Sequence, residues 1–160
     1  VIGKLLATTL MGVVSGLFTV LGLWGYLLIS SSSNMPNISA FDMIALILVT
    51  VFISMFFAAL NLMIGVYSKS YKEAQTYLMP VSLMCSVPTF FTYALDVSHI
   101  GLLELCIPVL NMICIVKEIL SGAVNIIHLG IVILWLLLYV CISLLITLRM
   151  FKKESVVFRI

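Results

Sequence analysis

The feature that most constrains this chain is the alternation of long apolar runs with short polar segments. The clearest polar segment spans residues 67–80 and carries three charged side chains. The run before it, 41–66, has one acidic residue near its start, and the run after it, 77–95, has no charge. About 20 apolar residues suffice for a helix to cross a bilayer. The pattern therefore predicts a polar loop held at one face of a membrane between two spanning helices.

The composition also indicates a membrane protein. Hydrophobic residues make up 64% of the 160 residues and charged residues only 9%, whereas soluble domains are roughly 25% charged. A soluble fold of this size has too high a surface-to-volume ratio to bury so much apolar surface. We therefore expect a multi-pass protein of the plasma (cytoplasmic) membrane, with the lipid bilayer as its main solvent. No run of charge indicates a nucleic-acid partner.

Several kinds of catalytic and metal-binding motif are missing from the sequence. It has no GxxxxGK[ST] phosphate loop, and no HExxH or paired-histidine motif for a metal. His99 and His128 are isolated near the ends of apolar runs, where an interfacial position is the simpler interpretation. The four cysteines have no CxxC spacing and are interpreted as apolar packing residues. We therefore expect neither a metal site nor an enzyme that acts on its own.

Four spanning helices are expected, at about residues 5–29, 41–66, 77–95 and 128–148. Gly12 and Gly16 in the first form a GxxxG pair, a spacing typical of close helix packing in membranes. Asn61 lies in the second, where an amide either bonds to a neighbouring helix or contributes to a path for an ion. Pro80 and Pro88 are expected to interrupt the third, because each removes a backbone donor.

The segment 100–127 is apolar enough to enter a membrane but holds Glu104, Asn111 and Glu118. A charge at the centre of a span costs about 2.5–3.5 kcal/mol or more, and Pro108 would break one helix into two short ones. The three polar residues are seven apart and would share a face if the helical phase survived the break. We therefore predict a re-entrant hairpin that enters one leaflet and returns. The expected fold is an all-α integral membrane protein with four transmembrane helices and this hairpin before the last.

The placement of charge predicts the orientation. With four crossings both ends lie on one side, which then holds seven of the eight cationic residues and leaves only Lys117 on the other. A crossing by residues 101–120 would instead divide them four against four. The positive-inside rule favours the first arrangement. It places both chain ends and the polar segment in the cytoplasm.

Several motifs in the chain are similar to those of one family of membrane proteins. Residues 72–80, KEAQTYLMP, resemble the KEAQ-T-Y-L-x-P signature of ABC-2-type permeases, in particular the NatB-like sodium-export subgroup. Residues 108–111 (PVLN) and 117–122 (KEILSG) resemble the P-x-L-N and K-E-L-L-x-G segment of that subgroup. Residues 3–7 (GKLLA) are similar to the start of its third membrane helix, and 151–158 (FKKESVVF) to its C-terminal end. The resemblance covers nearly the whole chain.

The resemblance implies that these are the last four of six membrane helices, in a chain that begins at Val1 as part of a longer protein. Such a protein is an exporter's permease subunit and not an enzyme. It has no cofactor of its own, because ATP is hydrolysed by a separate ABC ATPase subunit, and a second permease copy or homologue completes the transporter. Residues 67–76 correspond to a cytoplasmic loop that rests on the ATPase. The coupling residues expected in this loop are Lys69, Lys72, Glu73 and Gln75.

Sodium is the substrate that the resemblance suggests, and other functions stay open. ABC-2 exporters of peptides, antibiotics or lipids share this topology, and a non-transporting membrane scaffold or immunity protein would need no ATPase. An intramembrane hydrolase is disfavoured, because no catalytic constellation lies within the spans. The candidates for a substrate path are Asn61, Glu104, Asn111 and Glu118, whose oxygen atoms suit a hard cation. The structural alternative is that Glu118 pairs with Lys117 or a neighbouring helix and that Asn111 caps a short helix.

Overall fold

The computed structural model describes residues 2–29, 38–94, 97, 100–122 and 124–152. Every regular element in these residues is a helix, so the expected all-α fold is confirmed for them. The long helices are α1 (Ile2–Ile29), α2 (Ala40–Tyr67), α3 (Tyr71–Ala94) and α5 (Ile126–Lys152). A 3₁₀ turn, η2 (Glu104–Cys106), and the short helix α4 (Leu110–Leu120) lie between α3 and α5.

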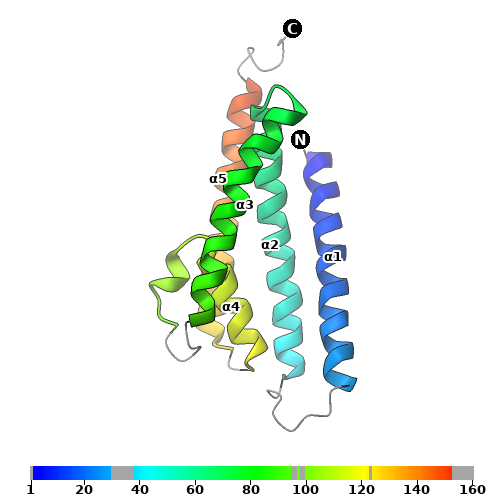
Figure 1. Ribbon diagram of the computed structural model, residues 1–160, viewed down its shortest axis with the longest axis vertical. Coiled ribbons are helices and arrows are strands. Elements are labelled where there is room, and N and C mark those ends of the chain that lie inside the picture. Colours follow the sequence, from blue (N-terminus) through cyan, green and yellow to red (C-terminus); the bar gives the residue numbers. More distant parts are fainter. Residues whose placement is uncertain (1, 30–37, 95–96, 98–99, 123, 153–160) are drawn as a thin grey trace.

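The four long helices run antiparallel along one axis, and α4 lies against the lower half of the bundle (Figure 1). The start of α1, the end of α5 and the turn between α2 and α3 all lie at the upper end in this view (Figure 1). The central helix is α2, which packs most extensively against α1 and α5 and also contacts α3 and α4. Four long helices thus return the chain to the end of the bundle at which it started.

Among the described residues, three helices are long and apolar enough to cross a membrane, over Gly3–Tyr26, Ala40–Tyr67 and Ile126–Met150. The shortest of these has 24 residues, roughly 36 Å at 1.5 Å per residue, which exceeds the roughly 30 Å of a hydrocarbon core. α3 is equally long but less apolar, because serine, threonine and proline are spread along it. Length and composition therefore support three of the four expected spans, and the crossing by α3 stays a prediction.

The structure of α3 corrects two expectations. The helix begins at Tyr71, well before the predicted span, so most of the expected loop forms the first turns of a helix. Only residues 68–70 connect it to α2. Pro80 and Pro88 lie inside α3, which continues through both, so the expected interruption is wrong. Each proline removes a single backbone donor, and the bonds of the neighbouring turns are enough to keep the helix continuous.

A capping box starts α2. Ser39 Oγ accepts a hydrogen bond from the backbone N–H of Phe41 (3.3 Å), and Asp42 Oδ2 accepts one from the N–H of Ser39 (2.7 Å). Asp42 is the one charged residue of α2 and is only 5% exposed. The Asp42 carboxylate accepts a backbone hydrogen bond at the start of the helix, where a negative charge is favourable. The rest of α2 contains no charged residue.

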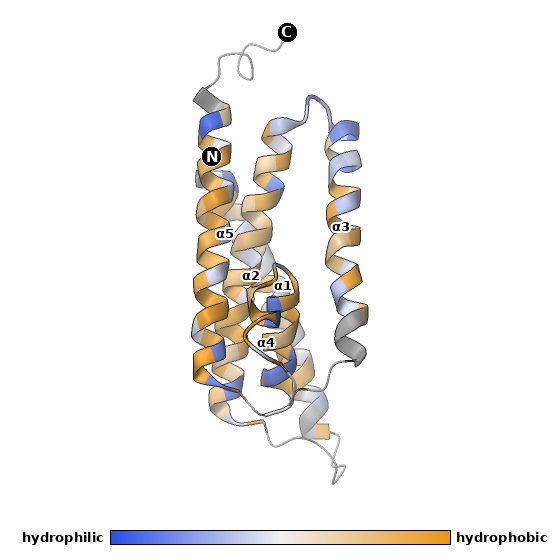
Figure 2. Ribbon diagram, turned by 90° about the vertical axis from the view of Figure 1, so that its left-hand side faces the viewer, coloured by the Kyte–Doolittle hydropathy of each residue, from blue (hydrophilic) through white to orange (hydrophobic). Residues whose placement is uncertain are grey.

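The segment between α3 and α5 rises along the bundle and returns to the same end (Figures 1 and 2). With 11 residues, α4 extends roughly 16 Å and is too short to cross a bilayer. The predicted break at Pro108 is confirmed, but only the second arm is an α-helix and the first is the single turn η2. Val109 completes the bend with φ 69°, a backbone region that β-branched residues rarely adopt.

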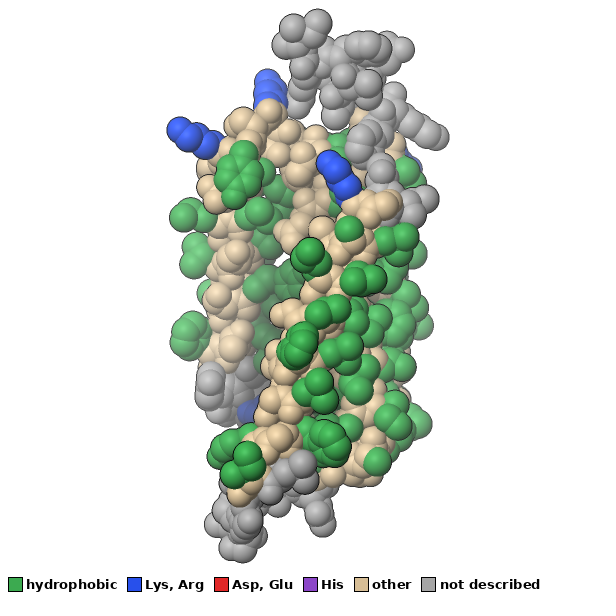
Figure 3. Space-filling model, turned by 90° about the vertical axis from the view of Figure 1, so that its right-hand side faces the viewer, with side chains coloured by type: hydrophobic (Ala, Val, Ile, Leu, Met, Phe, Trp, Pro, Cys, Tyr) green, Lys and Arg blue, Asp and Glu red, His purple; other side chains and the backbone are tan. Residues whose placement is uncertain are grey.

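The core lies where α2, α4 and α5 meet. Val49 of α2, Ile115 of α4 and Leu136 of α5 are fully buried there. Many large apolar side chains of the long helices are exposed, and Figure 3 shows hydrophobic side chains spread over one face of the molecule. An apolar surface of this extent is unusual for a protein in water. It is the surface that a bilayer covers.

Gly12 and Gly16 allow α1 to approach α2 closely. A Cβ atom on Gly16 would overlap Thr50 Cγ2, and one on Gly12 would lie 3.0 Å from Ser54 Cβ. The predicted GxxxG packing is therefore confirmed, and its partner is α2. Gly22, further along α1, would gain a Cβ with no atom within 4 Å.

We predict that Gly16→Ala lowers the stability of the protein, whereas Gly22→Ala does not. Both substitutions remove a glycine from a helix interior, which favours the helix by about 1 kcal/mol. At position 16 the new methyl group must push Thr50 away, and such overpacking costs about 1–3 kcal/mol. Thermal unfolding in detergent should show a lower Tm for Gly16→Ala only. Equal Tm values for the two variants would contradict the close approach of α1 to α2.

Candidate functional site

The first candidate region is the start of α3 with the turn before it. Ser70 Oγ accepts a hydrogen bond from the N–H of Glu73 (3.2 Å), and Glu73 Oε2 accepts one from the N–H of Lys69 (2.7 Å). This reciprocal arrangement resembles a capping box and explains why the helix starts inside the polar segment. Glu73 Oε1 also accepts a hydrogen bond from the Tyr77 hydroxyl (2.9 Å). The Glu73 carboxylate is therefore turned toward its own helix.

The other polar side chains of this region point outward. Lys69, Lys72 and Gln75 are exposed, and Gln75 Nε2 makes only a long contact of 3.4 Å with the Tyr71 hydroxyl. An open hollow of about 320 Å³ lies beside Lys69 and Tyr71, at the junction of the turn with the helix. Of the four expected coupling residues, three are thus presented at the surface, and Glu73 holds the helix start that carries them.

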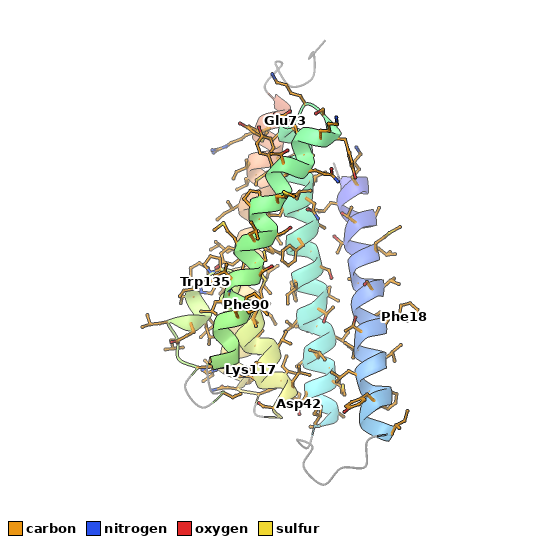
Figure 4. All side chains as sticks on the ribbon, in the orientation of Figure 1. Phe18, Asp42, Glu73, Phe90, Lys117 and Trp135 are labelled. Carbon is orange, nitrogen blue, oxygen red and sulfur yellow. The ribbon has the colours of Figure 1, made fainter. Side chains whose placement is uncertain are left out.

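The two ends of the bundle differ in charge. The cationic residues Lys4, Lys69, Lys72 and Arg149 lie at the end where α3 begins, and Figure 3 shows Lys and Arg side chains gathered there. Lys117 lies at the opposite end, as its label in Figure 4 shows. This division of the described cations is the one that four crossings predict.

The second candidate region is the inner face of α4. Asn111 and Glu118, two turns apart, are 0% and 3% exposed. Glu118 Oε1 lies 2.6 Å from Nδ1 of His128, in the first turn of α5. Glu118 Oε2 and both polar side-chain atoms of Asn111 have no hydrogen-bond partner among the described residues. A buried polar group without a partner costs about 1–3 kcal/mol, so these atoms mark positions where water or a ligand would be stabilised.

Cys114, on the same face of α4 as Asn111 and Glu118, is also fully buried.

The predicted substrate-path residues do not form a single site. Glu104 lies on η2, and its Oε2 accepts a hydrogen bond from the N–H of Gly101 (2.9 Å), so it does not share the face of α4. Asn61 lies on α2, in a groove that also contains Lys4. Only Asn111 and Glu118 share a face, and the two turns between them place their Cα atoms about 10 Å apart.

His128 is the residue that the sequence reasoning missed. The expectation of an isolated histidine is wrong, because the His128 side chain is 18% exposed and contacts Glu118, whereas its interfacial position stays a prediction. The alternative in which Glu118 pairs with a neighbouring helix is confirmed. The alternative in which Asn111 caps α4 is wrong, since Val109 holds the N-cap position without a side-chain hydrogen bond. Gly122, with φ 70°, lies between α4 and α5, where the chain turns before His128.

No group of three or more His, Cys, Asp or Glu side chains in the described part of the chain could hold a metal ion. The pair formed by Glu118 and His128 can bind a proton or a water molecule between helices, and it leaves one carboxylate oxygen open.

Comparison with known proteins identifies a similar membrane protein. The chain is 30% identical over 133 residues to the ABC transporter permease protein NatB of Bacillus subtilis (strain 168). The similarity covers 78% of this chain and 33% of that protein, so the chain spans about a third of the relative's length. No family model matches the chain, and no solved structure matches it. The chain is thus a distant homologue of an ABC transporter permease, as the motif at residues 72–80 indicated.

Proposed function

We propose, from this distant homology, that the chain is part of the permease subunit of an ABC exporter and works with a separate ATPase subunit. The observation that carries the proposal is the motif at 72–80, which forms the start of α3 at the cation-rich end of a bundle of membrane-length helices. A coupling surface must present polar groups to a soluble partner at a membrane face. ATP is then bound and hydrolysed on the partner, and transport requires a second permease copy or homologue.

In this proposal α3 also crosses the membrane, as the third of four crossings. It has 24 residues, and no charged residue follows Glu73 within it. Both described chain ends and the turn at 68–70 then lie in the cytoplasm, in agreement with the positive-inside rule. η2 and α4 form a hairpin at the outer face. Such a hairpin is acceptable at membrane depth because α2, α3 and α5 all contact α4 and cover it.

The proposed contact with the ATPase consists of Lys69, Lys72 and Gln75. Their side chains are exposed on the turn and the first turns of α3. Glu73 takes part by fixing this geometry, because its carboxylate bonds to the N–H of Lys69 and to the Tyr77 hydroxyl. A helix whose start is fixed in this way can transmit a displacement of the partner along α3 into the bundle.

Reversing two charges in this region, Lys69→Glu with Lys72→Glu, should remove the ATPase from the complex. Tagged wild-type protein, purified from its own membranes, should carry with it a chain that contains a phosphate-binding loop. The double reversal should reduce that recovery at least about tenfold, equivalent to about 1.4 kcal/mol. Mass spectrometry of the purified complex measures the recovery. Glu73 stays unchanged in this variant, so the start of α3 keeps its cap.

The control for this experiment is Arg149→Glu, which reverses an exposed charge at the same end of the bundle but on α5. It should leave ATPase recovery at the wild-type level. Equal recovery from all three proteins would remove the coupling role of the α3 start. A wild-type protein that recovers no ATPase would instead favour a membrane scaffold or immunity protein.

We further propose that the inner face of α4 lies along the path of an exported cation, with Na⁺ as the candidate that the motifs suggest. Glu118 Oε2 and the Asn111 amide offer buried oxygen atoms that have no described partner. Because the two residues are about 10 Å apart along the helix, they would act in succession. The proposed path does not include Asn61, which lies on α2 in the groove that also contains Lys4. An exporter of peptides, antibiotics or lipids is the alternative.

Glu118→Gln tests this path, because glutamine keeps the shape of the side chain and an acceptor for His128 but removes the charge. ATP-driven ²²Na⁺ uptake into inside-out vesicles should fall at least about tenfold, equivalent to about 1.4 kcal/mol in the barrier. The amount of folded complex should stay at the wild-type level. The matched control is Glu104→Gln, whose carboxylate bonds to the backbone of Gly101 away from this face, and it should transport normally.

Two outcomes would contradict the cation path. Full uptake by both Glu118→Gln and Asn111→Ala would show that neither residue takes part in transport. A smaller amount of complex with normal uptake per molecule would show that Glu118 acts only in holding α4 against α5.

A further inference from the structure

We propose that a groove between α1 and α2 binds a phospholipid with an anionic headgroup. Lys4 and Thr8 line the groove from α1, and residues between Ala58 and Val66 line it from α2. Its volume is about 590 Å³, within the roughly 300–1,000 Å³ of ligand pockets. The groove adjoins the hollow beside the α3 start, because Gly65 lines both, and it shares no residue with the inner face of α4. The inference does not depend on the proposed transport function.

Two polar side chains in the groove have no partner among the described residues. Lys4 is exposed and forms no ion pair there, and the exposed Asn61 side chain makes no hydrogen bond. The Thr8 hydroxyl, by contrast, is already bonded to the backbone carbonyls of Lys4 and Leu5 (2.9 and 3.1 Å). An ammonium group and an amide are thus available for a phosphate oxygen and the ester oxygens of a lipid.

The rest of the groove is apolar. Ala7, Ala58, Leu62 and Val66 supply hydrocarbon surface beside the polar pair. Lys4 lies at the cation-rich end of the bundle, where a membrane face is expected. The groove therefore offers a cation at the level of the headgroups and hydrocarbon surface beside it, which is the order of groups in a membrane phospholipid. Basic pockets between membrane helices on the cytoplasmic side are suited to anionic headgroups.

The combination of polar and apolar groups in the groove disfavours other ligands. An apolar membrane helix in the groove would cover the hydrocarbon surface but would supply no anion for the exposed Lys4 ammonium. A free phosphate would gain one cation and an amide but nothing from the apolar surface. A phospholipid is the ligand that uses both parts of the groove.

Two substitutions test the two parts of the groove separately. Lys4→Gln removes the charge and keeps a long polar side chain. Gly65→Leu fills the groove, because a Cβ on Gly65 meets no atom within 4 Å and the new side chain has room to enter. Arg149→Gln is the control, since it removes an exposed cation at the same end of the bundle but on α5.

Native mass spectrometry of the detergent-solubilised chain measures the binding of palmitoyl-oleoyl phosphatidylglycerol and phosphatidylcholine. The wild type and Arg149→Gln should bind phosphatidylglycerol about fivefold or more tightly than phosphatidylcholine. Lys4→Gln should bind both lipids equally. Gly65→Leu should lose the tight binding of both. Glycerol phosphate, which has the headgroup charge without acyl chains, should displace neither lipid.

Three results would overturn the proposal. The first is equal binding of the two lipids by the wild type, or an unchanged preference in Lys4→Gln. The second is displacement of phosphatidylglycerol by glycerol phosphate, which would indicate a site for a free anion. The third is a change of oligomeric state in Gly65→Leu with unchanged lipid binding, which would assign the groove to a second copy of the chain.

Discussion

A bilayer core tolerates neither an exposed charge nor an unbonded backbone group, and the rest of this structure depends on that constraint. Carboxylates at the starts of two long helices accept hydrogen bonds from backbone N–H groups. Asp42 bonds to the N–H of Ser39 at the start of α2, and Glu73 bonds to the N–H of Lys69 at the start of α3. Both helices therefore begin with a carboxylate that is bonded to a backbone N–H, and neither contains a charged residue beyond it.

The short helix α4 is where the constraint is relaxed, because neighbouring helices cover it. Its inner face buries Asn111 and Glu118, and α5 supplies His128 as the partner of one carboxylate oxygen. Buried polar atoms without a described partner are concentrated there. Val109, directly before α4, has a positive φ that a β-branched residue does not favour. The surrounding packing therefore holds the backbone in this conformation. Polar groups inside a membrane protein are costly, and they commonly mark functional positions.

The length of apolar runs was sufficient to predict α1, α2 and α5, and the GxxxG spacing predicted the close approach at Gly16. The start of α3 was not predictable from hydropathy, because the cap formed by Ser70 and Glu73 makes a polar stretch helical. The contact of Glu118 with His128 depends on the reversal of the chain between two helices, which no periodicity reveals. The polar groups of the hairpin could be recognised from the sequence, but their partners could not.

The central claim is that α3 crosses the membrane and that the cation-rich end of the bundle is cytoplasmic. Single substitutions Ser32→Cys, Ser70→Cys and Ser121→Cys, in a background without the four native cysteines, test it with an impermeant thiol reagent on intact cells. We predict labelling at positions 32 and 121, and protection at position 70 until the membrane is permeabilised. Protection at both 70 and 121 would show that α3 does not cross. Labelling at position 70 in intact cells would invert the proposed orientation.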